Sequence, residues 1–174
     1  MKYEPIIIEH DDGQEADAFQ PQSDCGAALF RAGVCSLGVN RLKDRFRGGS
    51  SCSNTHLLYA VIDGAVECLF GTETRKVEAG NMYIAPARGP HRVELTSSHC
   101  TAVWVHLYQQ PQWGFLFESG AHIRPLLVPD ELGMVTELLL RAARPETPAG
   151  PQLLELYAPI LLACLRRELQ DLHR

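Results

Sequence analysis

The 174-residue chain lacks long apolar runs, and none approaches the roughly 18 residues that a membrane-spanning helix needs. Its N-terminal stretch is polar and acidic, which is not the composition of a secretory signal peptide. The chain also has no excess of basic residues, because its formal net charge is −5. A protein that neutralises phosphates needs a basic face. These absences predict a cytoplasmic protein that does not enter a membrane and does not bind nucleic acid by itself.

Paired cysteines and the common catalytic signatures are missing too. The six cysteines include no C-x-x-C pair, and without a secretion signal they are typical of free, buried thiols. The alternative for Cys100, beside His99, is redox sensing, which requires an activated thiolate. The sequence has no G-x-S-x-G, no phosphate-cradling glycine loop and no H-E-x-x-H. No catalytic residue and no cofactor is therefore predicted.

The chain does contain a series of short apolar runs separated by turn residues. Strands are expected at 56–62, 65–70, 74–78, 82–85 and 91–95, with turns at Asp63-Gly64, Gly71-Thr72, Gly80-Asn81 and Gly89-Pro90. Pro86 ends one of these runs, because proline cannot donate a ladder hydrogen bond. Strands this short and this closely spaced predict an antiparallel sandwich or barrel.

Flanking segments complete the predicted architecture. A β-favouring run at 5–8 indicates an edge strand, 10–26 a loop or mobile arm, and 27–46 two strands that break at Gly33. Residues 101–108 form a further strand after a turn at 96–99. We therefore expect residues 1–26 to hold an edge strand and arm, 27–125 a β-barrel and 126–174 a helical segment, all in one compact domain.

Two helices are expected after Pro125. The first begins near Pro129 with Asp130 as its N-cap, and the second follows a Pro/Gly linker at 145–151 and runs towards Leu172. Pro159 should kink or divide the second helix. Its apolar side chains exceed one stripe, which favours two partners, the barrel on one side and a second protomer on the other. The predicted dimerisation residues are Leu154, Tyr157, Leu161 and Leu165, with Leu153, Leu156, Ile160 and Leu162 widening the surface.

The order of these signals resembles the N-terminal sensor and dimerisation domain of AraC-type transcription regulators. The likeness covers roughly residues 36–172 and rests on the Tyr59-to-Gly64 strand end, Gly80, Pro86, His91, the strand from Trp104 to Tyr108 and the leucine-rich tail. Asn81 stands where the family usually has Asp, a mild change because both side chains suit turns. The resemblance implies a cupin jelly-roll barrel followed by two or three helices.

The same resemblance implies a small-molecule effector and a homodimer. A full regulator of this type would continue past Arg174 into two helix-turn-helix units, so DNA contact would come only through that missing part. The chain is then either an excised sensor half or a stand-alone relative.

The expected effector site lies on one face of the strand at 101–108. Alternation places Trp104, His106 and Tyr108 together, with a flat ring for stacking and polar tips for hydrogen bonds. The other predicted ligand-binding residues are His91 and His56, from neighbouring strands, and Arg41, whose guanidinium suits an anionic or hydroxylated group. Each of these side chains has an alternative role, in the core or at the surface.

Two other functions remain open. The first is a metal-dependent cupin enzyme, an isomerase or dioxygenase. At the positions of the usual first cupin metal motif the chain has Ser50, Cys52 and Leu57, so the only ligand set left is His56, His91 and His106. The second is a filled barrel that dimerises and binds nothing.

Overall fold

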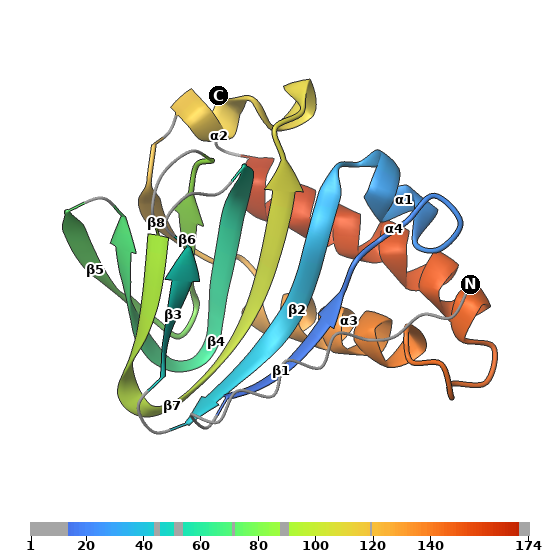
Figure 1. The fold of residues 1–174 in the computed structure, drawn as a ribbon, viewed down its shortest axis with the longest axis horizontal. Helices are drawn as coiled ribbons and strands as arrows, with labels where there is room; N and C mark the ends of the chain where they lie inside the picture. Colours follow the sequence, from blue (N-terminus) through green and yellow to red (C-terminus); the bar gives the residue numbers. More distant parts are fainter. Residues whose placement is uncertain are drawn as a thin grey trace.

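A computed structural model describes residues 14–43, 46–50, 54–70, 72–87, 91–118 and 120–170 (Figure 1). The strands are β1 (Gln14–Phe19), β2 (Val34–Lys43), β3 (Arg47–Ser50), β4 (Thr55–Phe70), β5 (Glu73–Glu78), β6 (Asn81–Ala85), β7 (His91–Tyr108) and β8 (His122–Pro125). The helices are α1 (Ala27–Arg31), η1 (Pro111–Trp113), α2 (Phe115–Glu118), α3 (Pro129–Ala142) and α4 (Gly150–Leu169). The edge strand predicted at 5–8 lies outside the described residues.

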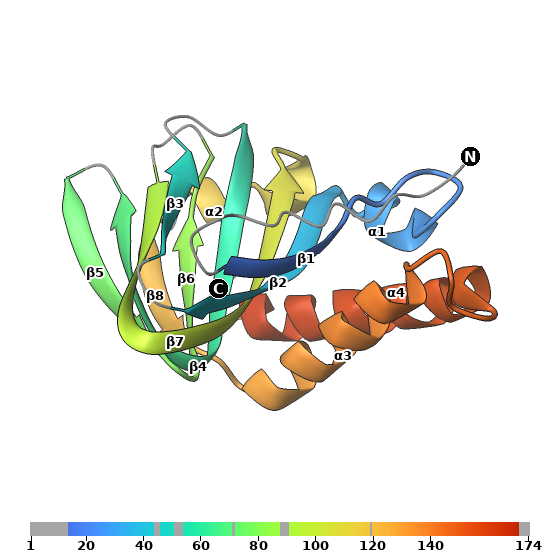
Figure 2. The ribbon, with the colours of Figure 1, turned by 60° about the horizontal axis from the view of Figure 1, so that its bottom comes forward.

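The strands form one eight-stranded antiparallel sheet in the order β1-β2-β7-β4-β6-β8, with β3 added to β7 and β5 added to β4. The long strands β4 and β7 run through its centre, and the sheet curls around them (Figure 1). Figure 2 shows α3 and α4 packed beneath β1 and β2. The predicted fold class, a mainly β, cupin-like barrel followed by helices, is confirmed.

The core has two parts because β4 and β7 are buried on both faces. On β7, Val103, Val105 and Leu107 belong to the cluster that the helices cover. Ala102 and Trp104, one residue out of phase, belong to the cluster inside the curl of the sheet. The alternation predicted for this strand is therefore correct, and we call the second side the interior face.

Both central strands are longer than predicted. Asp63-Gly64 is a bulge within β4 rather than a turn, and register shifts flank it at Val61/Asp63 and Gly64/Val66. The expected turn at 96–99 likewise lies within continuous β7. Gly64 has φ +80°, and a Cβ atom there would lie 2.1 Å from the carbonyl oxygen of His99. Only glycine fits this close crossing of the two strands.

The N-terminal third differs from the prediction in two places. Residues 14–19, expected in a loop or arm, form β1 and pair in register with β2 from Gln14↔Leu42 to Phe19↔Leu37. Residues 27–31, expected in a strand, form the short helix α1. The break at Gly33 is confirmed, with φ +79°.

The two C-terminal helices lie close to their predicted positions. Val128, not Asp130, is the N-cap of α3, and it makes no side-chain cap. The buried carboxylate of Glu168 on α4 replaces that cap, because it accepts the N–H groups of Leu127 at 2.7 Å and Val128 at 3.2 Å. α4 includes Pro159 without being divided. No helix among the described residues is long and apolar enough to cross a membrane.

The predicted dimerisation leucines are not at the surface. Leu154, Leu161 and Leu165 are at most 1% exposed, and they pack in the core between the helices and the sheet. This corrects the prediction, because side chains buried within one protomer cannot contact another. Tyr157 is half-buried against the same core. The large apolar side chains that α4 exposes are instead Leu156 and Ile160.

Candidate functional site

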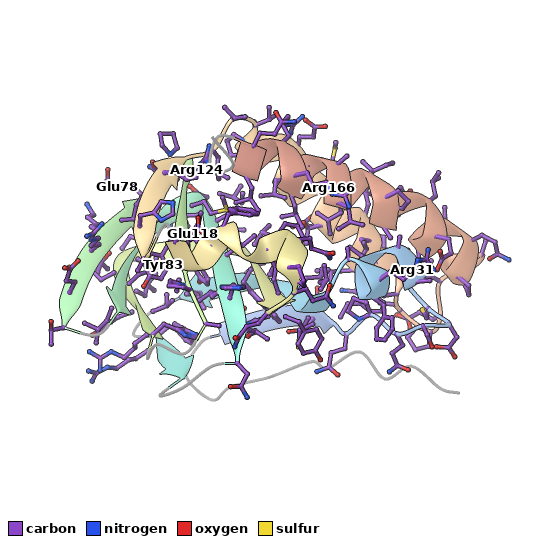
Figure 3. All side chains as sticks on the ribbon, turned by 90° about the horizontal axis from the view of Figure 1, so that it is seen from above. Arg31, Glu78, Tyr83, Glu118, Arg124 and Arg166 are labelled. Carbon is purple, nitrogen blue, oxygen red and sulfur yellow. The ribbon has the colours of Figure 1, made fainter. Side chains whose placement is uncertain are left out.

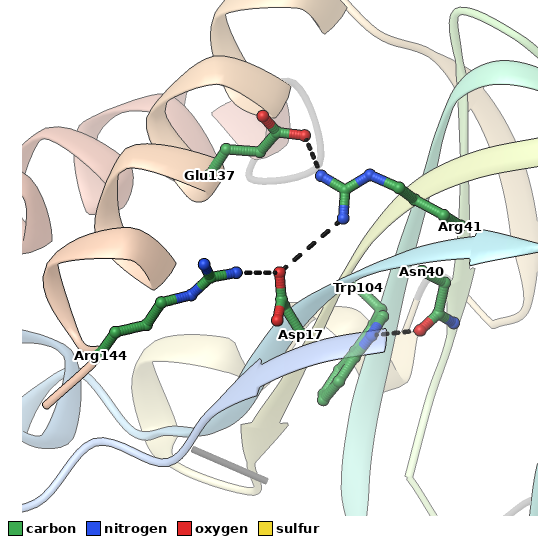
Figure 4. Close-up of polar contacts among 6 residues, drawn as sticks. All are labelled: Asp17, Asn40, Arg41, Trp104, Glu137 and Arg144. Carbon is green, nitrogen blue, oxygen red and sulfur yellow. Dashed lines mark hydrogen bonds and ion pairs between the residues drawn. The ribbon is translucent and has the colours of Figure 1, made fainter. Parts of the chain in front are cut away.

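The interior face carries a group of polar and aromatic side chains centred on Trp104. Its indole N–H donates to the side-chain oxygen of Asn40 on β2 at 3.0 Å (Figure 4). The ring lies over Gly38, the residue opposite Trp104 in the sheet, where a Cβ atom would be 2.6 Å from the ring. Glycine at position 38 and the amide of Asn40 thus fix the indole against β2.

His106 extends this group along β7. Its ring packs edge-on against Trp104, with centroids 5.5 Å apart, and lies 6.2 Å from the ring of His91. The hydroxyl of Thr55 on β4 is 2.9 Å from its Nδ1 atom. Desolvation, reinforced by His91, lowers the pKa of His106 to about 4. The imidazole is therefore neutral at pH 7, and it can offer both a donor and an acceptor.

We call Asn40, Thr55, His91, Trp104 and His106 the interior cluster. It contains no lysine, arginine, aspartate or glutamate. Apolar side chains surround it, among them Leu57, Tyr59, Val61, Tyr83, Ala85 and Ala102. The arrangement is a mostly apolar wall with a few convergent hydrogen-bonding groups, which is typical of small-molecule sites.

His56 does not join the interior cluster. Leu57 is the residue opposite His106, so His56 points to the other face of the sheet, opposite Leu107. There it is fully buried, and its Nδ1 accepts the N–H of Ala87 at 3.1 Å. Desolvation lowers the pKa of His56. The prediction that His56 lies with the ligand-binding residues is therefore wrong in its geometry.

The proposed metal triad fails for the same reason. His91 and His106 share the interior face, but His56 lies behind the sheet, so the three rings do not converge. Within the described residues, no three His, Cys, Asp or Glu side chains come together as a metal site would require. Cys52 lies outside the described residues.

Arg41 also lies on the helix side of the sheet. Its guanidinium is 2.6 Å from Glu137 of α3 and 3.8 Å from Asp17 of β1. Arg144 reaches the same Asp17 at 3.0 Å (Figure 4). This network joins the edge strand to α3, and it accounts for Arg41 without a ligand.

Tyr108 shares the strand face of His106 but sits at the end of β7 with 47% of its surface exposed. A hydrogen bond with Cys35 raises the pKa of its hydroxyl. Tyr108 thus lies beside the interior cluster, at its edge.

The interior thiols do not support redox sensing. Burial raises the pKa of Cys68 and of Cys100 to about 12, so both thiols stay protonated near neutral pH. Burial also raises the pKa of Tyr59 and of Tyr83. In their protonated forms these thiols and hydroxyls are poor nucleophiles.

Sequence reasoning missed Asn40 and Thr55. Asn40 lies between Val39 and Arg41 in a loosely alternating strand. It is two residues from the apolar Leu42, so both lie on the same strand face, and this was the indication in the sequence that Asn40 faces the interior. Thr55 sits at the first position of β4, just outside the apolar run that defined that strand. Both contacts depend on strand register, which the pattern of one strand does not contain.

No family model and no curated protein matches the chain. Similar solved structures include an HTH_3 family transcriptional regulator from Vibrio cholerae, with 14% identity, a TM-score of 0.48 and coverage of 57% of this chain and 54% of that chain. The Cnp3 cupin domain of Schizosaccharomyces pombe matches at 7% identity and a TM-score of 0.47, over 62% and 73% of the two chains. An oxalate decarboxylase mutant from Bacillus subtilis matches at 14% identity and a TM-score of 0.47, over 57% and 26%. The match thus spans about half of the regulator and a quarter of the decarboxylase. Similarities this distant do not identify an activity.

Proposed function

We propose that this chain is a small-molecule sensor domain, of the kind that precedes the DNA-binding part of AraC-type regulators, and that its effector binds at the interior cluster. The observation that carries the proposal is the hydrogen-bonded set of Trp104, Asn40 and His106 on an otherwise apolar face. Trp104 and His106 are only half-buried, so both retain surface for a ligand.

The chemistry of the interior cluster favours an uncharged ligand with hydroxyl groups or a ring. The cluster has no acidic or strongly basic side chain, and His106 is neutral at pH 7 because its pKa is about 4. Arg75, a cation that acts on Tyr83 of this face, is already paired with Glu73 at 2.7 Å. A charged ligand would lose its hydration here without gaining a partner.

The sheet itself supplies a route from effector to helices. Trp104 and His106 face the interior, while Val103 and Val105, their neighbours on β7, pack in the core beneath α3 and α4. A ligand that shifts the register or tilt of β7 would therefore change how α3 and α4 pack against the sheet. Sensing by this route requires a ligand that binds one of two arrangements of β7 and the helices more tightly than it binds the other.

The test is a thermal-shift and calorimetric screen of neutral sugars, polyols and small phenols at pH 7. We expect at least one class to raise the melting temperature. We expect Trp104→Phe and His106→Leu to weaken its binding at least about tenfold, since the first removes the indole ring that Asn40 holds in place and the second removes a hydrogen-bonding imidazole. The matched control is His99→Gln, an exposed histidine elsewhere on β7.

Two outcomes count against the proposal. One is a screen in which no class shifts the melting temperature. The other is a ligand whose affinity is the same in the wild-type protein, Trp104→Phe and His106→Leu, because such a ligand binds elsewhere.

A further inference from the structure

A concave site lies outside the barrel, between α1, η1 and α4. It is a cleft of about 370 Å³ lined by Ala28, Arg31, Ala32, Gln112, Pro159, Leu162 and Arg166. Figure 3 labels its two charged residues, Arg31 on α1 and Arg166 on α4. None of these residues belongs to the interior cluster, and the volume falls in the range of small-molecule pockets.

The two arginines distinguish this cleft from an ordinary surface depression. Neither guanidinium forms an ion pair with any residue that the structure describes, although both line the same cleft. Several other arginines are paired with carboxylates, namely Arg41, Arg47, Arg75, Arg144 and Arg167. Two unpaired positive groups on one small cleft favour an anion, in a chain whose formal net charge is −5.

Two carboxylates of the C-terminal helices are engaged elsewhere. Glu155, one helical turn before Pro159, accepts the N–H groups of Gly26 and Ala27 at 3.1 and 3.3 Å. Glu131 pairs with Arg167 at 2.9 Å. Neither of these carboxylates forms an ion pair with Arg31 or Arg166.

The rest of the lining is apolar or fixed. Ala28, Pro159 and Leu162 contribute aliphatic carbon, and the Nε2 atom of Gln112 donates to the carbonyl oxygen of Ala32 at 2.6 Å. A ligand matched to this surface has one anionic group and a small aliphatic body. The planar fork of arginine suits a carboxylate better than it suits a spherical anion.

We propose that the cleft binds a small carboxylate with an aliphatic tail, held by Arg31 and Arg166 and resting on Leu162 and Pro159. Such a ligand would bridge α1, which precedes β2, to α4. It would tie the N-terminal part of the fold to its last helix. This inference stands on different residues from the proposed effector site and does not depend on it.

The probe is sodium hexanoate, titrated into the full chain by calorimetry. We expect saturable binding of one molecule per chain. Acetate, which has the charge without the tail, and 1-hexanol, which has the tail without the charge, should each bind at least about tenfold more weakly. Inorganic phosphate should also bind more weakly, because it offers no apolar surface.

Variants locate the site. Arg31→Gln and Arg166→Gln should each weaken hexanoate binding at least about tenfold, since each removes a charge-assisted hydrogen bond. The matched control is Arg141→Gln, an exposed arginine on α3 that does not line the cleft and forms no ion pair with a described residue. It should bind hexanoate as the wild type does. Trp104→Phe should also leave hexanoate binding unchanged, which separates this test from that of the interior cluster.

Three results overturn the proposal: 1-hexanol or phosphate binding as tightly as hexanoate, wild-type affinity in both arginine variants, or no heat of binding for hexanoate. All the arginines changed are exposed, so the variants should fold, and a circular dichroism spectrum verifies this.

Discussion

Replacing Gly64 by alanine tests whether the bulge in β4 holds the barrel together. The added Cβ atom would lie 2.1 Å from the carbonyl oxygen of His99 and 3.0 Å from the Cα atom of Cys100, both on β7. Reaching an ordinary contact requires the two backbones to separate by roughly 1 Å. The positive φ of +80° adds a cost of about 1–2 kcal/mol for any residue with a side chain.

The separation also affects hydrogen bonds around the bulge. The side chain of Ser97 bridges the N–H and C=O of Ala65 at 3.0 and 3.1 Å, and the N–H of Ala79 donates to the carbonyl oxygen of Gly64 at 3.0 Å. Each lost bond costs about 1 kcal/mol. We therefore expect Gly64→Ala to lower the free energy of unfolding by about 3–4 kcal/mol.

Gly80 supplies the matched control. Its φ is +81°, but a Cβ atom there would meet nothing within 4 Å. Gly80→Ala should therefore cost only the conformational term, about 1–2 kcal/mol. Urea denaturation followed by circular dichroism measures the free energy of unfolding of both variants. In a thermal scan, the larger loss of stability should place the melting temperature of Gly64→Ala roughly 4–8 °C below that of Gly80→Ala. Equal destabilisation of the two variants would refute the steric argument.

Two further predictions concern buried ionisable groups. Because the pKa of His106 is about 4 in the folded chain and 6.5 is the ordinary value, the unfolded state binds the proton first, and the free energy of unfolding should fall as the pH drops from 6.5 to about 4. His106→Gln should flatten this fall in denaturant titrations at several pH values; identical profiles for the wild type and His106→Gln would contradict the assignment. Glu168→Ala removes the buried acceptor of two backbone N–H groups before α3 and should cost about 2–4 kcal/mol in urea denaturation. The exposed Glu155 also accepts two N–H groups, and Glu155→Ala should cost about 1 kcal/mol or less; an equal cost for both would show that burial is not the cause.

The fold class was predictable from the residues that end strands and form turns, because their effect on the backbone has a physical basis. Glycine at positive φ and proline without an N–H restrict where strands can run, so Gly33, Gly80 and Pro86 were informative in the sequence. Gly64 was misleading because an Asp-Gly pair fits a bulge as well as a hairpin turn. Whether the chain reverses there or continues depends on its pairing with β7, which lies about 30 residues later.

The candidate site was predicted where one strand face differed from the other. On β7, aromatic and imidazole side chains alternate with valine and leucine, so Trp104 and His106 were assigned correctly to one face. The strand that begins at Thr55 is apolar on both faces because both are buried, so its pattern gave no indication that His56 and His106 lie on opposite sides.

The buried side of α4 was also difficult to predict from its sequence. α4 is apolar on more than one side, and its composition does not show which leucines the sheet covers. Leu161 and Leu165 pack inward, while Leu156 and Ile160 remain exposed. The direction of packing depends on where α3 and β7 lie, and that is a property of the assembled fold rather than of the helix.

The placement of the two tryptophans gives the molecule a built-in pair of reporters. The indole N–H of Trp104 donates to Asn40 inside the curl of the sheet, and that of Trp113 donates to the carbonyl oxygen of Ala32, a residue of the cleft beside α1. The chain has only these two indoles. A proton–nitrogen correlation spectrum therefore contains one indole signal for each proposed site, and a ligand that moves one signal but not the other identifies where it is bound.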